Sequence, residues 1–382
     1  MNSAGAESQP PPRRSGDLPP VWRLPLLLLA VLALAGGVRA GLARLGWEPA
    51  YRFAALTVHH GPLLVGGFLG SVIGLERAVA LGRRWGYLAP LLAGAGALAL
   101  PLGFTPLLAA LAHAGAAALL CAMSLRFWQL QPNLANATVV AGAVAWLGGN
   151  LAWLGGQPLA DVAPWWLAFL VLTVAGERLE LSRYLPVGVA ARRLFAVLLL
   201  LLPGGVLLRH GWPAGDLLAA ASLLAAIAWL VRHDIARFSV RRPGLPRFAA
   251  LAIFNGYAWA ALAALAWLAG GGLVPGSLAF DVALHGVFLG FVLSMVFAHA
   301  PIVLPAVAGV ALPFHVGFYL PLLLLDLSLL LRFAGAAVGL PALRAAGGVG
   351  HALALLLFRA CVAWALRSGR LAARAATVRP TS

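Results

Sequence analysis

Several of the nine histidines lie inside apolar runs of the sequence, where an ionisable side chain needs a reason to be present. These histidines are His59, His60, His113, His285, His299 and His351. Neutral imidazole is the usual protein ligand for haem iron and for copper. Histidines that converge from several helices at one depth would therefore form an axial-ligand or copper site. The competing interpretation of any single one is structural hydrogen bonding inside a helical bundle.

A His-Gly pair opens two of the predicted helices at equivalent depth, His60-Gly61 and His285-Gly286. Glycine has no side chain, so a bulky planar ligand can approach the backbone beside it. We predict that His60 and His285 are opposing axial ligands of one b-type haem. His59 competes for the first position, because it lies about 100° round the same helical turn.

Two of the histidines belong to one predicted helix over 278–303. His285 and His299 share a face of it but lie about 21 Å apart along the axis, at 1.5 Å per residue. One site cannot hold both, so they would serve two sites, or one site and a path. His113, His299 and His351 are the candidate metal ligands, with copper as the expected metal.

Small residues and charges recur in two further patterns. Gly66, Gly70 and Gly74 repeat at every fourth position and line one side of a helix. They could form a groove for a flat macrocycle, but close helix packing is the favoured interpretation. The adjacent charges of Glu76-Arg77 and Glu177-Arg178 are interpreted as charge compensation and anchoring at the membrane boundary.

The composition identifies the elements that must position these residues. The chain is 62% hydrophobic and 10% charged, with a mean hydropathy of +0.93. Soluble domains carry about a quarter charged residues. Lipid must therefore be the solvent for much of this surface.

The basic residues bear on topology rather than on a nucleic-acid partner. All 27 are arginine, giving a net charge of +16, and they cluster between apolar runs. Most fall in alternate connections when the N-terminus is placed in the cytoplasm. The positive-inside rule then predicts that both termini are cytoplasmic, with the lipid bilayer as the partner and no nucleic acid.

The predicted fold is an all-α transmembrane bundle of about twelve spans, each needing about 20 apolar residues. We place the spans near 24–41, 54–80, 85–102, 104–125, 134–155, 162–181, 193–209, 214–231, 247–270, 278–303, 314–333 and 347–366. The tenth is expected to stop at Pro301 and Pro305.

The chain is expected to divide into three parts. A disordered tail over 1–20 precedes one transmembrane domain over 21–367, and a basic tail covers 368–382. The first helix resembles a signal sequence, but we expect it to stay uncleaved in a bacterial inner (plasma) membrane. Two cysteines inside apolar runs predict no structural disulfide.

The two histidine helices resemble the NnrS family of haem- and copper-containing membrane proteins. The resemblance rests on HGVFLG at 285–290 with Met295, and on HHG at 59–61 before GGFL at 66–69. It implies haem, copper and a link to nitric oxide or nitrosative stress. The layout is also similar to the catalytic subunit of haem–copper oxidases, which binds a haem between helices two and ten. Those oxidases' copper-site histidines have no counterpart here, so oxygen reduction is not expected.

Two other classes of protein compete with a haem protein. One is a cofactor-free transporter or channel, for which Asp281 and Asp326 are the only candidate ion-coupling carboxylates near membrane depth. Paired discontinuous helices in matched halves, which many transporters show, are not evident. The other is an assembly factor or scaffold with structural histidines. A visible spectrum distinguishes a haem protein from both of these classes.

Overall fold

The computed structural model describes residues 17–47, 56–212, 214–308 and 312–378. These residues form helices and connecting turns, with no strand among them. Eleven helical segments are long and apolar enough to cross a membrane. The predicted all-α class is therefore confirmed, and the chain is a membrane protein by the length and composition of its helices.

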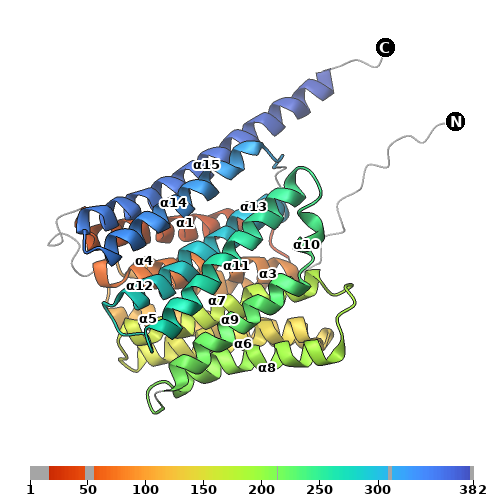
Figure 1. Ribbon diagram of the computed structural model, residues 1–382. Helices are drawn as coiled ribbons and strands as arrows, with labels where there is room; N and C mark the ends of the chain where they lie inside the picture. The colour runs from red at the N-terminus through yellow and green to blue at the C-terminus, as the bar shows by residue number, and fades with distance from the viewer. Residues whose placement is uncertain (1–16, 48–55, 213, 309–311, 379–382) are drawn as a thin grey trace.

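The helices follow one another through short connections (Figure 1). They are α1 (Pro20–Arg44), η1 (Pro62–Gly70), α3 (Ser71–Leu81), η2 (Arg84–Tyr87), α4 (Leu88–Ala99), α5 (Pro106–Leu130), α6 (Leu134–Leu154), α7 (Leu159–Leu181), α8 (Val189–Leu208), α9 (Ala214–His233), α10 (Ala236–Ser239), α11 (Leu245–Ala269), α12 (Leu278–His285), η3 (Gly286–Phe291), α13 (Val292–Ala308), η4 (Val316–Phe318), α14 (Tyr319–Ala337) and α15 (Pro341–Val378). η1 and η3 are π-helices, and η2 and η4 are 3-10 helices.

The predicted span at 85–102 is the one that is not among the eleven. The structure has α4 there, with 12 residues, a length of about 18 Å at 1.5 Å per residue. That is shorter than the hydrocarbon core of about 30 Å. α4 packs against α1, α5 and η1 inside the bundle. The tight turn predicted around Pro101 and Pro106 is present, because α4 ends at Ala99 and α5 begins at Pro106.

The prediction that Pro301 and Pro305 stop the tenth span is wrong. α13 continues through both prolines to Ala308. Proline removes one N–H from the helical ladder but does not always end a membrane helix, since neighbouring helices can satisfy the freed backbone groups. Similarly, α15 runs as a helix to Val378, through most of the stretch where a tail was expected.

The two ends of the bundle are marked by buried aspartates. We call the end at which α12 begins the Asp281 end, and the opposite end, where α9 ends, the Asp234 end.

Most of the predicted tail over 1–20 lies outside the described residues. Within the described part, Asp17 binds Arg23 of α1 (2.8 Å) and the hydroxyl of Tyr87 in η2 (2.5 Å). Burial and the hydrogen bond to Asp17 raise the pKa of Tyr87 to about 12.

The first and last helices are antiparallel, and they connect the two ends. α1 begins at the Asp234 end, beside Tyr87. α1 finishes at the Asp281 end, where Trp47 Nε1 donates to a carbonyl at the start of α15 (2.9 Å). α15 therefore runs back towards the Asp234 end, and its last turns project beyond the bundle (Figure 1). The start of α1 and the end of α15 thus lie on the same side.

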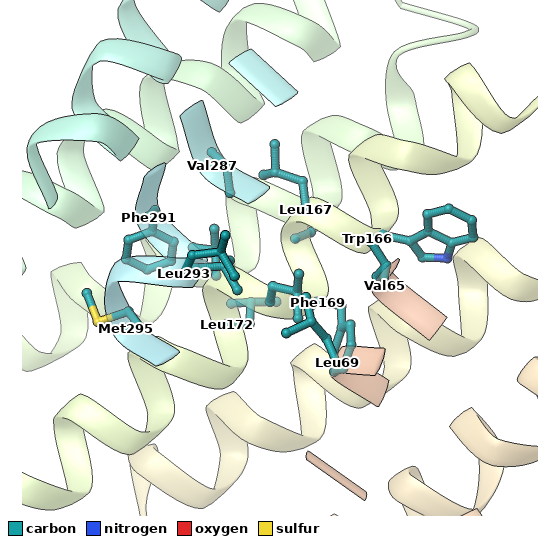
Figure 2. Close-up of a cluster of buried hydrophobic side chains, with 14 of the residues drawn as sticks. Val65, Leu69, Trp166, Leu167, Phe169, Leu172, Val287, Phe291, Leu293 and Met295 are labelled. Carbon is teal, nitrogen blue, oxygen red and sulfur yellow. The ribbon is translucent and has the colours of Figure 1, made fainter. Parts of the chain in front are cut away.

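α7 is among the most enclosed helices, and α12 and α13, which flank η3, contact it. A Cβ on Gly61, the residue before η1, would lie 3.3 Å from the Trp166 ring of α7. Figure 2 shows Val65 of η1 and Val287 of η3 in one buried apolar cluster with Trp166 and Leu167. The helices that begin with the two His-Gly pairs therefore approach a common core helix. π-Helical turns were not anticipated from the sequence; they are rare and are frequent at functional sites.

Candidate functional site

A buried carboxylate organises the Asp281 end of the bundle. Asp281 accepts hydrogen bonds from Arg332 Nε (3.2 Å) and Nη2 (2.7 Å), which both come from α14. His285 Nδ1 lies 2.8 Å from Asp281 Oδ1, one helical turn along the same helix. Arg344, at the start of α15, is 3.4 Å from the second oxygen. Asp281 therefore links three helices and fixes one of the predicted haem ligands.

The proton position on His285 follows from its partners. Its Nδ1 also lies 3.0 Å from the backbone oxygen of Asp281. A carbonyl oxygen can only accept, so Nδ1 carries the proton and donates. The lone pair of the neutral ring is then on Nε2, which makes no hydrogen bond within the described chain.

His351 has the same arrangement. Its Nδ1 lies 2.6 Å from Ser328 Oγ. Ser328 donates its own hydroxyl hydrogen to Leu325 O (2.8 Å), so it accepts from His351. His351 Nε2 is buried and has no hydrogen-bond partner among the described residues. An unpaired buried acceptor is uncommon and needs an explanation.

His60 is the third imidazole of this group. Its Nδ1 lies 3.3 Å from Thr57 O, and it is close enough to His285, Arg44 and Arg332 to interact with them electrostatically. His351 likewise interacts with Arg332, His285 and Asp281. The structure therefore brings the predicted pair of haem ligands, and one predicted metal ligand, to the same end of the bundle.

We call His60, Asp281, His285, Arg332 and His351 the histidine cluster. Each of its imidazoles donates through Nδ1 and keeps Nε2 for another partner. A hydrogen bond on the second ring nitrogen is what orients histidines that bind metals. Such imidazole nitrogens and the surrounding arginines are the groups that would hold haem iron and haem carboxylates, respectively. The glycines beside the cluster have another use.

The glycines next to the predicted ligands are packing positions. A Cβ on Gly61 would lie 3.3 Å from the Trp166 ring, and one on Gly290 would lie 2.4 Å from Trp259. Gly286 faces Ala263 at 3.1 Å. The expectation that these glycines open the backbone to a planar ligand is therefore wrong, because side chains of neighbouring helices already cover them.

The glycine repeat on η1 and α3 is also a packing surface, as favoured from the sequence. A Cβ on Gly66 would lie 2.4 Å from the His113 ring, and one on Gly70 would lie 2.5 Å from Trp146. Gly74 faces Pro90 of α4 at 3.3 Å. Small residues here allow close approach of helices and of two large side chains.

The rings of His59 and His113 both lie beside Trp153. Their ring centroids are 6.4 and 5.7 Å from that of Trp153, respectively. His113 is fully buried, and its Nε2 lies 3.2 Å from Ala93 O, so it uses the opposite nitrogen from the cluster histidines. Of the adjacent pair, it is therefore His60 that lies with His285.

His299 lies near the Asp234 end, in a different charged group. Its Nε2 is 3.4 Å from Arg178 Nη1, and Arg178 forms two hydrogen bonds with the fully buried Asp234, at 2.5 and 2.7 Å. Tyr257 Oη also donates to Asp234 (2.5 Å). His299 thus stands far from His285, as the spacing along the helix required.

The boundary charges are paired differently from their order in the sequence. Arg178 pairs with Asp234 rather than with its neighbour Glu177. Glu177 pairs with Arg77, from the other adjacent pair, at 3.1 Å. Neighbouring residues on a helix point about 100° apart, so they contact different helices. Arg178 therefore does not compensate its neighbour Glu177, whereas Arg77 acts on its neighbour Glu76 and also pairs with Glu177.

The described part of the chain contains no set of ligands for the predicted copper. Within it, no three His, Cys, Asp or Glu side chains are placed to hold one metal ion. Cys121 and Cys361 are free thiols, as expected. His113, His299 and His351, the candidate copper ligands, belong to three separate environments.

Arg332 is a site residue that the sequence analysis does not identify. It falls inside the predicted span at 314–333. Asp281 also lies inside a predicted span. Opposite charges inside two apolar runs are a signal for an intramembrane ion pair. Ser328 gave no such signal, because a lone serine is common in membrane helices.

Together, the fold and the histidine cluster define a polytopic helical membrane protein with a buried ionisable site near one end. The chain belongs to the family described as Domain of unknown function (DUF8744), whose model matches residues 23–367. No curated protein and no solved structure matches the chain. The resemblance to the NnrS proteins and to haem–copper oxidases therefore stays a resemblance.

Proposed function

We propose that this protein binds a b-type haem through His60 and His285, near the Asp281 end of the bundle. The observation that carries the proposal is the shared state of the cluster imidazoles, which donate through Nδ1 and leave Nε2 unused. A neutral imidazole binds haem iron through such a lone pair. Asp281 would keep His285 in the required orientation and tautomer.

The arginines of this end support the same ligand. Haem carries carboxylates, and a buried or half-buried anion needs cationic partners. Arg44 is exposed beside His60, and Arg344 Nε is buried with no hydrogen bond among the described residues. A haem between two imidazoles would supply one-electron transfer, which favours membrane redox chemistry. The link to nitric oxide or nitrosative stress rests on the resemblance alone.

Separate histidine variants test this proposal. We expect His60→Ala and His285→Ala to lose haem, because each removes one axial donor. His59→Ala is the matched control and should retain haem, since its ring lies beside Trp153 instead. The measurement is the pyridine haemochrome content of detergent-purified protein made in haem-replete cells, with monodispersity checked by size exclusion. Retention of haem in both His60→Ala and His285→Ala would exclude this ligand pair.

We further propose that both termini face the cytoplasm of a bacterial inner membrane. The excess of arginine in alternate connections supports this orientation. The start of α1 and the end of α15 lie on the same side, which supports an even number of crossings: the eleven long helices and the shorter helical stretch of η2 and α4. Reporter fusions after α15 should therefore read as cytoplasmic. A periplasmic signal from a stable fusion would contradict the orientation.

A further inference from the structure

Asp326 is a carboxyl group in the middle of α14. It lies seven residues after Tyr319, where the helix begins, which is about 10 Å along the axis at 1.5 Å per residue. Leu323, Leu327 and Leu330 on the same helix are exposed and would face lipid. Asp326 itself is half-buried, on the side of α14 that meets α11. An acidic residue at this depth is costly and marks a functional site by default.

The hydrogen bonds of Asp326 all reach one of its oxygens. Asn255 Nδ2 (2.8 Å) and Trp259 Nε1 (2.7 Å), both from α11, donate to Oδ1. The same Asn255 nitrogen donates to Ser294 Oγ on α13 (3.1 Å). Asp326 Oδ2 makes no hydrogen bond with the described residues. The group is thus held firmly in place, with one oxygen left available.

Among the described residues, no cation pairs with Asp326. Most other acidic residues of the described chain form an ion pair with an arginine. Glu76, which also lacks an ion pair there, still interacts with the neighbouring Arg77. The partners of Asp326 in the described chain are the two neutral donors of α11. The ionisable groups of the nearby helices are occupied elsewhere: Asp281 and His285 on α12 with Arg332, and His351 on α15 with Ser328.

We propose that Asp326 is a proton-binding site within the membrane, which carries its proton on Oδ2 at neutral pH and exchanges it with water. An ionised carboxylate without a countercharge is strongly disfavoured in hydrocarbon, so the group neutralises by taking up a proton. In the described chain, no three His, Cys, Asp or Glu side chains are placed to hold a metal ion. The proposed bound species is a proton, which adds to the carboxylate as a simple association.

The position of Trp259 connects this site to the histidine cluster. Its indole donates to Asp326, and its ring covers Gly290 of η3, the π-helix that directly follows His285. Protonation of Asp326 would therefore act, through Trp259, on the helix that carries one proposed haem ligand. The proton site itself does not depend on the haem proposal.

A lipid-soluble carbodiimide tests the proposal directly, because it reacts with protonated carboxyl groups in apolar surroundings. Full-length protein in lipid vesicles is treated with dicyclohexylcarbodiimide at neutral and at alkaline pH, and peptides are mapped by mass spectrometry. We expect an adduct on Asp326 at neutral pH, a decrease at alkaline pH, and loss of the adduct in Asp326→Asn. Asp281, paired with Arg332, is the internal control and should stay unmodified.

An infrared spectrum gives a second measurement that does not require the reagent to reach the site. The wild type should show the carbonyl stretch of a protonated carboxylic acid at neutral pH, and this band should weaken in Asp326→Asn. If that variant does not fold, loss of the band at alkaline pH in the wild type replaces the comparison. No adduct on Asp326 together with no protonated-acid band would overturn the proposal, whatever the haem content.

Discussion

Replacing Asp234 by asparagine is expected to destabilise the protein by about 3–5 kcal/mol, the usual effect of breaking a buried ion pair. Arg178 is only 4% exposed and Asp234 is completely buried, so the substitution leaves a buried cation without its countercharge. Asp234 also accepts hydrogen bonds from Tyr257 Oη and from the backbone N–H of Ala236. The measurement is the thermal midpoint of the purified protein in detergent, followed by size exclusion.

Two variants separate this effect from a general sensitivity to substitution. Arg183→Gln removes an exposed ion pair with Glu180 and is expected to leave the thermal midpoint almost unchanged. The double variant Arg178→Met/Asp234→Leu removes both charges and is expected to recover most of the lost stability. Equal midpoints for Asp234→Asn and Arg183→Gln would show that this pair contributes no more than a surface contact.

Replacing Asp281 by asparagine is expected to produce two changes at the opposite end. Arg332 loses its buried partner, which costs about 3–5 kcal/mol of stability. His285 loses the carboxylate that orients it, and loss of such a partner typically lowers the affinity of a metal site by about 10–100-fold. Thermal midpoints and haem titration of the purified apoprotein measure the two changes separately.

Arg344→Gln is the matched control for the stability effect of Asp281→Asn. Arg344 lies 3.4 Å from the same carboxylate, but its side chain is 42% exposed, so its loss is expected to change the stability little. An Asp281→Asn protein that folds and binds haem as tightly as the wild type would show that the carboxylate does not orient a ligand.

The membrane fold was predictable because its signal is additive over many residues. Long apolar runs identify spans by length alone, and almost every predicted span has a helix of sufficient length. The length of α4 was not predictable in this way, because an apolar run bounded by tight turns does not reveal how much of it is helical. The prediction that prolines end α13 failed because packing against neighbouring helices can override the local propensity of proline.

The candidate site was predictable only in part. The shared depth of His60 and His285 followed from the order of the spans and from their positions near helix starts. The choice between His59 and His60 needed the helix rotation, which places one beside Trp153 and the other beside His285. Pairings such as Asp281 with Arg332 join residues distant in sequence, so no local pattern encodes them.

The visible spectrum of the wild-type protein shows directly whether it binds a haem. Protein made in haem-replete cells and purified in detergent should show a Soret band. After reduction, it should show the sharp α and β bands of a low-spin haem with two imidazole ligands, in the stoichiometry of one haem per chain. Wild-type protein that is folded, monodisperse and supplied with haem, yet shows no Soret band, would contradict the account and favour a cofactor-free transporter or channel.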